Sequence, residues 1–398
     1  MKNTLPDAYI LMRVYFPAKG KIQIRRRLRT ALASAAENMA QYRRAGGRAW
    51  MLINDDTGAA PGLLAGVLVH AGLQREQYVI TRTQGLGSAF AMHRLQSEFL
   101  SQTERHSEAF AMILDQDDRL TDGALLYIGR KMEPKAIVIS PFRVEDPAGL
   151  DILDDGGRRH NRIARRICAG TALRKDLAAL SSIAWTKSYS REALQQYHDD
   201  LTELLDNTRG SAPRFLSEIR AYDDFVDFYT LLQRNTKINA VYFPTHIYIK
   251  HDAAITANPR VKDFKTNRVA MLLVLTDLCF RNRNKLCADF MTMLRTYLFI
   301  KIANIRSVIR KYETDGKDHA FLQKVNSSPA YIAGCLADAA LHGPAEPTDE
   351  QTPIRSEQTA ENLMTLLRIP RRTDKTPDEE IKQLLIKESQ DERHLYSF

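Results

Sequence analysis

The segment of this chain best suited to chemistry is a run of acids, Asp115, Asp117 and Asp118, which follows the apolar residues Ala109–Leu114. The apolar run has the length and composition of a buried strand, although a buried helical turn shares this pattern. Carboxylates this close repel one another unless a positive charge lies between them, and Mg²⁺ or Mn²⁺ suits such oxygen ligands. A plain turn after a strand is the alternative, because aspartate is common in turns.

A second pair of acids, Asp55 and Asp56, follows the short strand-like segment Ala49–Ile53. If this segment and Ala109–Leu114 belong to one parallel sheet, their carboxyl ends share one edge, which is where ligands of open α/β sheets bind. The two acidic clusters together therefore predict a common ligand site more strongly than either does alone.

The segments that must position these acids alternate between strand-like and helix-like patterns from Ala8 to Leu120. Such alternation favours βαβ units, right-handed crossovers and a mainly parallel sheet. The expected order is strand Ala8–Phe16, helix Arg25–Arg44, strand Ala49–Ile53, helix Pro61–Ala71, strand Gln77–Thr81, helix Ala89–Leu100 and strand Ala109–Leu114.

This order of elements and acids resembles the nucleotide-sugar half of the GT-A fold, and most of all the inverting glycosyltransferases of family 2. The residues that carry the resemblance are Asp55-Asp56, the turn Gln84–Gly87 and the run from Asp115 to Asp118. The match covers Tyr9 to Met132, and the Asn and Arg-Asn features usual in the third unit are missing. It implies an α/β fold with a Rossmann-like, mainly parallel mixed sheet flanked by helices, and a C-terminal helical extension.

The resemblance also implies a reaction, the transfer of a sugar from a nucleotide-diphosphate sugar to an acceptor hydroxyl with inversion. Asp55 or Asp56 would accept hydrogen bonds from the base, and Asp115 would hold the ribose or a metal-bound water. Asp117 would bind Mn²⁺ or Mg²⁺, with Asp118 as the alternative ligand. The donor would also lie against the turn that contains Gly85.

The second half of the chain supplies weaker matches to the same family. The motif Tyr222-Asp223-Asp224-Phe225, within a helical stretch Arg214–Leu232, resembles a Glu-Asp motif whose Asp is the general base, which by position is Asp224. Asp223 replaces the usual Glu, so the choice between the two acids stays open. An acid pair at a helix N-terminus, interacting with the helix dipole, is an equally good interpretation.

Other candidate contacts come from single residues. The segment Ser182–Leu194 resembles the family's acceptor side, where Trp185 would stack on a sugar ring, although a core position suits a large aromatic better. The segment Val241–Lys250 is strand-like, and the family implies a metal or diphosphate contact for His251, with His246 as the second choice. The basic run that begins at Arg158, in a segment with a loop-like composition (Arg143–Arg166), would neutralise leaving-group charge or simply be solvated.

The chain has 398 residues and a net charge of +9, so an anionic partner is expected. A basic helical stretch, Thr266 to Tyr312, would dock on an anionic membrane, track DNA phosphates or pack on the catalytic domain. The predicted domains are a catalytic domain 1–260, with a nucleotide-sugar half 1–132 and an acceptor half 133–260, a basic helical region 261–340, a linker 341–360 and a helical tail 361–398.

The sequence thus predicts a glycosyltransferase whose acceptor is a glycan or a lipid-linked glycan. A sugar transferase acting on hydroxylated DNA bases and a non-catalytic nucleic-acid-binding protein are the alternatives. The four cysteines show no CxxC pairing, and no secretory signal or long apolar run is visible. We therefore expect a cytoplasmic location, with peripheral attachment at the inner face of the membrane left open.

Overall fold

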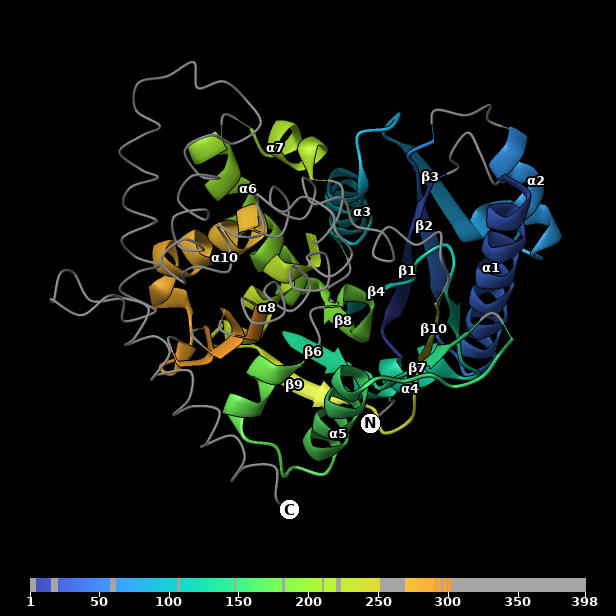
Figure 1. Cartoon of the computed structure of the whole chain (residues 1–398). Helices are drawn as coiled ribbons and strands as arrows, with labels where there is room; N and C mark the ends of the chain where they lie inside the picture. The colour runs from blue at the N-terminus through green and yellow to red at the C-terminus, as the bar shows by residue number, and fades with distance from the viewer. Residues whose placement is uncertain are drawn as a thin grey trace, which may run out of the picture.

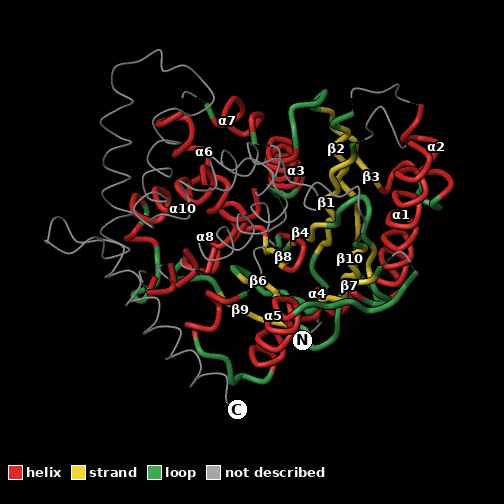
Figure 2. Tube along the Cα trace, viewed as in Figure 1, coloured by secondary structure: helices red, strands yellow, loops and turns green. Residues whose placement is uncertain are grey.

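The computed structural model describes residues 5–15, 21–57, 62–105, 108–146, 148–180, 183–209, 211–219, 223–250, 269–290, 292–294, 296–298 and 300–301. Its centre is a seven-stranded sheet in the order β3-β2-β1-β4-β8-β6-β9, with helices on both faces (Figures 1 and 2). The strands are β1 (Asp7–Val14), β2 (Ala49–Asp55), β3 (Tyr78–Arg82), β4 (Ala109–Ile113), β6 (Ala136–Ile139), β8 (Lys187–Ser190) and β9 (Lys237–Ala240).

The first half of the chain forms the parallel part of this sheet, as the alternating pattern predicts. Strands β2 and β4 both run parallel to β1, and β3 runs parallel to β2. The crossover helices are α1 (Lys21–Arg44), α2 (Gly62–His70) and α3 (Ser88–Gln102). The mainly parallel α/β fold expected from the sequence is confirmed.

Strand β1 is buried on both faces because its neighbouring side chains enter two different cores. Ile10 and Met12 pack in the cluster that contains α1, together with α4 (Ala124–Lys131). Tyr9 and Leu11 pack in the cluster that contains α3 and α6 (Arg191–Arg209). Burial on both faces explains why the central strands read as continuous apolar runs.

Strand β8 is the largest departure from the expected fold, because Ser182–Leu194 carries no strand pattern. Its residues lie antiparallel between β4 and β6 and are all buried. Polar residues such as Lys187 and Ser188 therefore occupy the middle of the sheet, where a buried strand is usually apolar. Helix α6 begins directly after this strand.

The prediction that Arg143–Arg166 is loop-like is wrong. Its first residues lie in β7 (Phe142–Glu145), which forms a small second sheet with β10 (His246–Ile249) and β5 (Arg119–Leu120). Residues from Asp155 onward form helix α5 (Asp155–Cys168). The two glycines that suggest a loop lie in its first turn, where the Asp154 carboxylate accepts the Gly157 amide at 2.7 Å and caps the helix.

The basic helical stretch is described in part. Helix α10 (Val269–Arg281) buries Leu272, Leu275 and Leu278 in the core shared with α6 and α8 (Phe228–Leu232), as the packing interpretation predicts. Tyr297 stacks on Phe228 with ring centroids 3.9 Å apart. The linker and the helical tail fall at 302–398, outside the described residues.

Candidate active site

The two acidic clusters lie on one edge of the sheet, on either side of β1. Val14 pairs with Asp55 on one neighbouring strand, and Leu11 pairs with Ile113 on the other. Because both neighbours run parallel to β1, the acids that follow them emerge in the same direction. Their strands are separated by two strand spacings, roughly 10 Å, which a single nucleotide spans.

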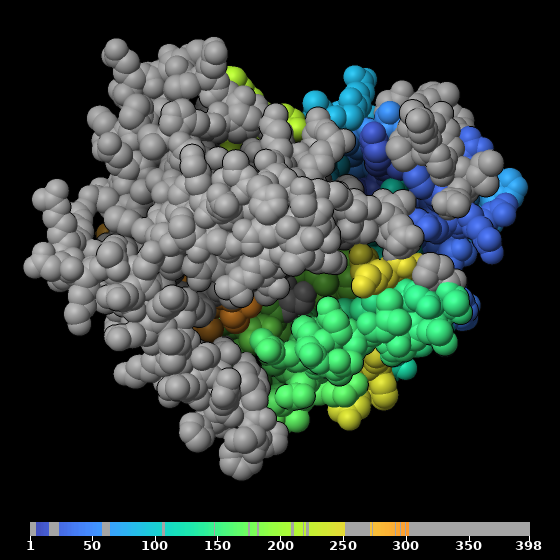
Figure 3. Space-filling model, in the orientation of Figure 1, coloured from blue at the N-terminus to red at the C-terminus, as the bar shows by residue number. Residues whose placement is uncertain are grey.

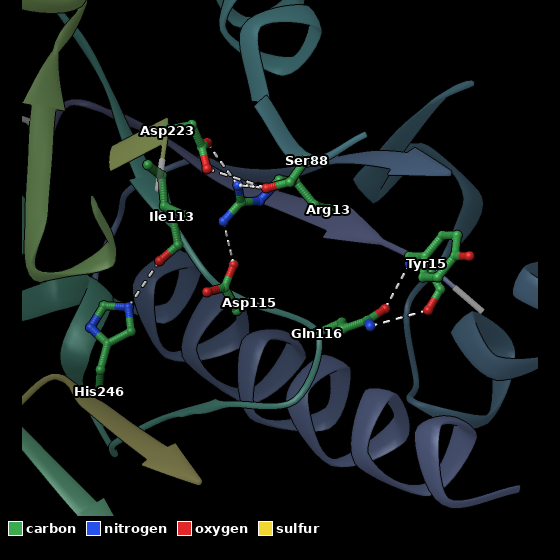
Figure 4. Close-up of polar contacts among 8 residues, drawn as sticks. All are labelled: Arg13, Tyr15, Ser88, Ile113, Asp115, Gln116, Asp223 and His246. Carbon is green, nitrogen blue, oxygen red and sulfur yellow. Dashed lines mark hydrogen bonds and ion pairs between the residues drawn. The ribbon is translucent and has the colours of Figure 1, made fainter. Parts of the chain in front are cut away.

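Arg13, near the carboxyl end of β1, joins two parts of the chain that are far apart in sequence (Figure 4). Its guanidinium donates to Asp115 Oδ1 at 2.9 Å and to Asp223 Oδ2 at 2.9 Å. It also donates to the Ser88 hydroxyl at 2.6 Å, and that hydroxyl lies 3.3 Å from Asp223 Oδ1. Asp115, Asp223 and Ser88 at the start of α3 thus surround one cation.

The charges around Arg13 depend on one another. Burial lowers the pKa of the Arg13 guanidinium, but Asp223 and Asp115 outweigh burial, so this pKa is raised and the cation persists. Burial raises the pKa of Asp115, Arg13 opposes the rise, and Asp117 adds to it, leaving the pKa above its usual value. The positive charge of Arg13 therefore does not fully offset burial and the negative charges of Asp117 and Asp223 around Asp115.

Asp56 is held by the turn before α3. Its Oδ1 accepts the Gly85 amide at 2.9 Å and lies 2.6 Å from the Thr83 hydroxyl, while its Oδ2 accepts the Gly87 amide at 2.8 Å. Gly85 and Gly87 both have positive φ, at +84° and +92°, which favours glycine there. Asp56 therefore shapes the Gln84–Gly87 turn, whereas Asp55 accepts one amide, from Thr57 at 3.0 Å through Oδ1.

Asp118 differs from Asp56 because one of its oxygens has no partner among the described residues. Its Oδ1 accepts the Ile249 amide at 3.0 Å, and its buried Oδ2 accepts no hydrogen bond from that part of the chain. Burial raises the pKa of this carboxyl well above its usual value, and Asp117 and Asp115 raise it further. A buried carboxyl beside two more acids either stays protonated or is stabilised in its ionised form by a nearby positive charge.

A divalent cation fits this place, although the described residues contain no complete group of three metal-binding side chains. Asp117 and Asp118 are hard oxygen ligands of the kind that Mn²⁺ and Mg²⁺ prefer. These ions also take water or phosphate oxygens as further ligands, so two protein carboxylates suffice to hold one beside a substrate diphosphate.

Asp223 and Asp224 begin a short 3-10 helix, η4 (Asp223–Asp227), and have different surroundings. Asp223 is engaged by Arg13 and Ser88, as described above. Burial raises the pKa of Asp224 to about 7; Asp223 and Asp227 add to the rise, and Lys187 and Lys301 oppose it. A carboxyl with a pKa near neutrality is suited to accept a proton at physiological pH.

A buried network lies behind Asp224. Asp227 also has its pKa raised to about 7, first by burial, against the opposing effect of Lys187. The Tyr189 hydroxyl donates to Asp227 Oδ2 at 3.4 Å. Burial lowers the pKa of Lys187, while Asp227 and Asp224 oppose that change. Acids and a lysine on β8 and η4 thus share one low-dielectric environment.

The remaining predicted residues have partners other than these acids or lie outside the described chain. Arg158 is exposed on α5 and pairs with Asp155 at 2.6 Å. His246 is buried, bonded through Nε2 to the Ile113 carbonyl at 2.9 Å, and burial lowers its pKa to about 4. Trp185 stacks on His246 in the core, so the core interpretation of this tryptophan holds. His251 lies outside the described residues.

Arg13 and Ser88 are the site residues that sequence reasoning missed. A signal was present for the arginine, because Arg13 is the single cation in the apolar segment Ala8–Phe16 and falls near its carboxyl end. Its partner Asp223 is 210 positions away, and no local pattern reports such a contact. Ser88 is the first residue of α3, where serine is commonly read as a helix cap.

Comparison with solved structures identifies the architecture. The first 349 residues of S. aureus TarS superpose with a TM-score of 0.50 and 11% identity, covering 91% of this chain and 90% of that one. The chain has the GT-A fold. A mannosyltransferase, PcManGT from Pyrobaculum calidifontis in complex with GDP-Man and Mn²⁺, aligns over 92% of this chain and 87% of its own, at 13% identity and TM-score 0.42. No protein-family model and no curated protein matches the sequence.

Proposed function

We propose that the chain is an inverting glycosyltransferase that moves a sugar from a nucleotide-diphosphate sugar to a hydroxyl of a glycan or lipid-linked glycan. The observation that carries this proposal is the Arg13 junction, which brings Asp115 and the Asp223-Asp224 pair to one point of the GT-A sheet edge. An inverting transfer needs acids for the donor and a separate base for the acceptor, and this edge offers both.

On the donor side, the two acids after β2 take different roles. Asp55, whose Oδ1 accepts the Thr57 amide, accepts a hydrogen bond from the nucleotide base through Oδ2 in this proposal. Asp56 positions the turn at Gly85, because its oxygens already accept two amides and lie beside a hydroxyl. Asp115, partly exposed beside Arg13, binds a ribose hydroxyl.

Asp117 and Asp118 hold a divalent cation in this proposal. When bound, Mn²⁺ or Mg²⁺ stabilises the negative charge that builds on the departing diphosphate. The unpartnered Oδ2 of Asp118 supports a ligand role for this residue next to Asp117. Arg13 engages Asp115 Oδ1 and opposes the rise of the Asp115 pKa.

On the acceptor side, Asp224 is the base. Asp223 is engaged by Arg13 and Ser88, whereas the pKa of Asp224, about 7, suits a base. Asp224 takes the proton from the acceptor hydroxyl as its oxygen forms a bond to the anomeric carbon. The bond from that carbon to the diphosphate oxygen breaks on the opposite face, so the configuration inverts.

The test is a panel of nucleotide sugars incubated with the full chain and Mn²⁺, read out as released nucleoside diphosphate. We expect turnover of at least one donor, loss of metal-dependent turnover in Asp117→Asn, and inverted anomeric configuration of the product by proton NMR. Asp199→Asn is the matched control, because this aspartate is exposed on α6. Release of no nucleotide from any donor, or wild-type turnover of Asp117→Asn, would contradict the proposal.

A further inference from the structure

Helix α5 carries a group of arginines that the proposed reaction does not use. Side chains from this helix, the residues around it and the stretch after β9 line an open pocket of about 500 Å³. The pocket is rimmed by four guanidinium groups and one aromatic ring, which together define the α5 patch: Arg158, Arg162, Arg165, Arg166 and Tyr242.

The α5 patch keeps a positive charge because the nearby aspartates are already paired with arginines or with backbone amides. Asp155 pairs with Arg158, and Asp176 pairs with Arg166 at 3.1 Å. Arg162 and Arg165 are exposed and have no acidic partner within the described chain, and Arg165 lies 5.7 Å from the centre of the Tyr242 ring. Three aspartates of the preceding loop accept backbone amides there: Asp146, Asp151 and Asp154.

Exposed apolar side chains lie beside the α5 patch or flank α5 in sequence. Tyr242 and Phe243 are each more than half exposed, and Phe243 packs against Tyr127 of α4 at 5.8 Å between ring centroids. Of the nine large hydrophobic side chains exposed in the described part of the chain, six flank α5 in sequence or lie on this aromatic group: Tyr127, Leu150, Ile152, Leu173, Tyr242 and Phe243. Figure 3 shows the green surface of this region facing the viewer, with the yellow stretch after β9 beside it.

The position of α5 relates the patch to the reaction edge. His160 and Asn161 bond to backbone oxygens of Ser140 and Phe142, just beyond the carboxyl end of β6. Strand β6 runs in the same direction as β4, because both are antiparallel to β8. Helix α5 is therefore anchored at the same edge of the sheet as the acids, two strands beyond β4.

We infer that the α5 patch docks this protein on an anionic phospholipid surface. Arginines attract acidic headgroups, and tyrosine and phenylalanine beside them enter the interfacial layer of a bilayer. Nucleic acid fits less well. Exposed aliphatic side chains such as Leu150 and Leu173 make no favourable contact with phosphates, but burying them in lipid is favourable. The described part of the chain has no helix with the length and apolarity of a membrane span. This docking goes beyond the proposed transfer and stands whether or not that transfer occurs.

The test is co-sedimentation of the full chain with vesicles of phosphatidylcholine containing phosphatidylglycerol, compared with phosphatidylcholine alone. We expect binding to the acidic vesicles only. Each arginine near an anionic surface contributes about fivefold to partitioning, so the double variant Arg162→Gln/Arg165→Gln binds about 30-fold more weakly. The matched control is Arg25→Gln/Arg29→Gln, which removes two exposed charges from α1 and retains most of the binding.

Three further measurements make the inference falsifiable. Phe243→Ser/Leu150→Ser weakens vesicle binding without lowering the melting temperature, because both side chains are exposed. Equal losses in the α1 and α5 charge variants would show that net charge alone drives binding, and would overturn the inference. Tight binding of duplex DNA with no vesicle binding, or complete competition by millimolar inorganic phosphate, would overturn it as well.

Discussion

Asp56 and Asp118 are both buried aspartates that follow parallel strands of one sheet, yet their surroundings are opposite. The oxygens of Asp56 are occupied by two amides and a hydroxyl of a neighbouring turn. Asp118 accepts one amide, has one oxygen without a donor among the residues that the structure describes, and has a pKa raised by burial and by the nearby acids. Asp56 is thus satisfied by its own fold, whereas Asp118 has the unsatisfied oxygen that the proposed cation would contact.

The same contrast separates Asp223 from Asp224. Asp223 is neutralised by Arg13, while Asp224 has a pKa of about 7, set first by burial. Neighbouring residues of the same type therefore divide into one that is paired with Arg13 and one that we propose as the base. This division can be tested by substitutions that keep the shape of each side chain and remove its charge.

The largest effect is expected for Asp224→Asn. An asparagine cannot accept the acceptor proton, so the rate of sugar transfer falls by about 10²–10⁴-fold, the usual contribution of a general base. The melting temperature is expected not to fall, since the substitution removes a buried charge with raised pKa. Steady-state release of nucleoside diphosphate measures the rate. An unchanged rate would show that Asp224 is not the general base.

Substitution of Arg13 by glutamine is expected to cost stability. The guanidinium compensates Asp115 and Asp223, whose side chains are 29% and 17% exposed. Leaving these acids unpaired destabilises the fold by about 3 kcal/mol, the lower end for breaking a buried ion pair. Urea unfolding measures the loss, and Arg13→Lys is the control that keeps the charge. Equal stability of Arg13→Gln and the wild type would show that the junction does not hold the two halves together.

The pair Asp56→Asn and Asp118→Asn tests the comparison directly. Asp56→Asn replaces an acceptor of a backbone amide by a donor and lowers the free energy of unfolding by about 2 kcal/mol. Asp118→Asn retains an oxygen for the Ile249 amide and removes a poorly compensated charge, so the metal-free stability does not fall. Urea denaturation in the presence of EDTA measures both, and equal losses would contradict the distinction.

A smaller effect is expected in the pH profile. Asp224 must be deprotonated to act as a base, so kcat/KM rises with pH through about 7 and falls tenfold per pH unit well below it. Asp223 is among the groups that raise the pKa of Asp224, so Asp223→Asn moves this limb to lower pH. Asp199→Asn leaves it in place. If the acidic limb does not move in Asp223→Asn, the charge of Asp223 does not raise the pKa of the base.

The sequence predicted the parallel half of the fold because its strands are buried on both faces. Ala109–Leu114 reads as a strand, and its acids lie at the predicted edge. Strand β8 was missed because its buried residues include Lys187 and two serines, which are accommodated by partners from distant segments. Helix α5 was missed because two glycines mask a helix start that Asp154 caps.

The candidate site was predictable only in its acids. The positions of Asp55 and of the Asp115–Asp118 run follow from local strand patterns. The Arg13 junction depends on contacts between residues 102 and 210 positions apart, which a periodicity cannot report. Which acid is satisfied and which is not depends on the same tertiary packing, so the different roles of Asp56 and Asp118 required the structure.

The most direct measurement is the thermal unfolding of the full chain with Mn²⁺ and either UDP or GDP, compared with EDTA, for the wild type and Asp118→Asn. A ligand that binds only the folded state raises the free energy of unfolding, by an amount that grows with the logarithm of its concentration above Kd. We expect a higher melting temperature for the wild type with Mn²⁺ and one of the nucleotides, and no increase for Asp118→Asn. A wild-type melting temperature that is unchanged by Mn²⁺ with either nucleotide, or an equal increase in the variant, would contradict a cation held by these acids.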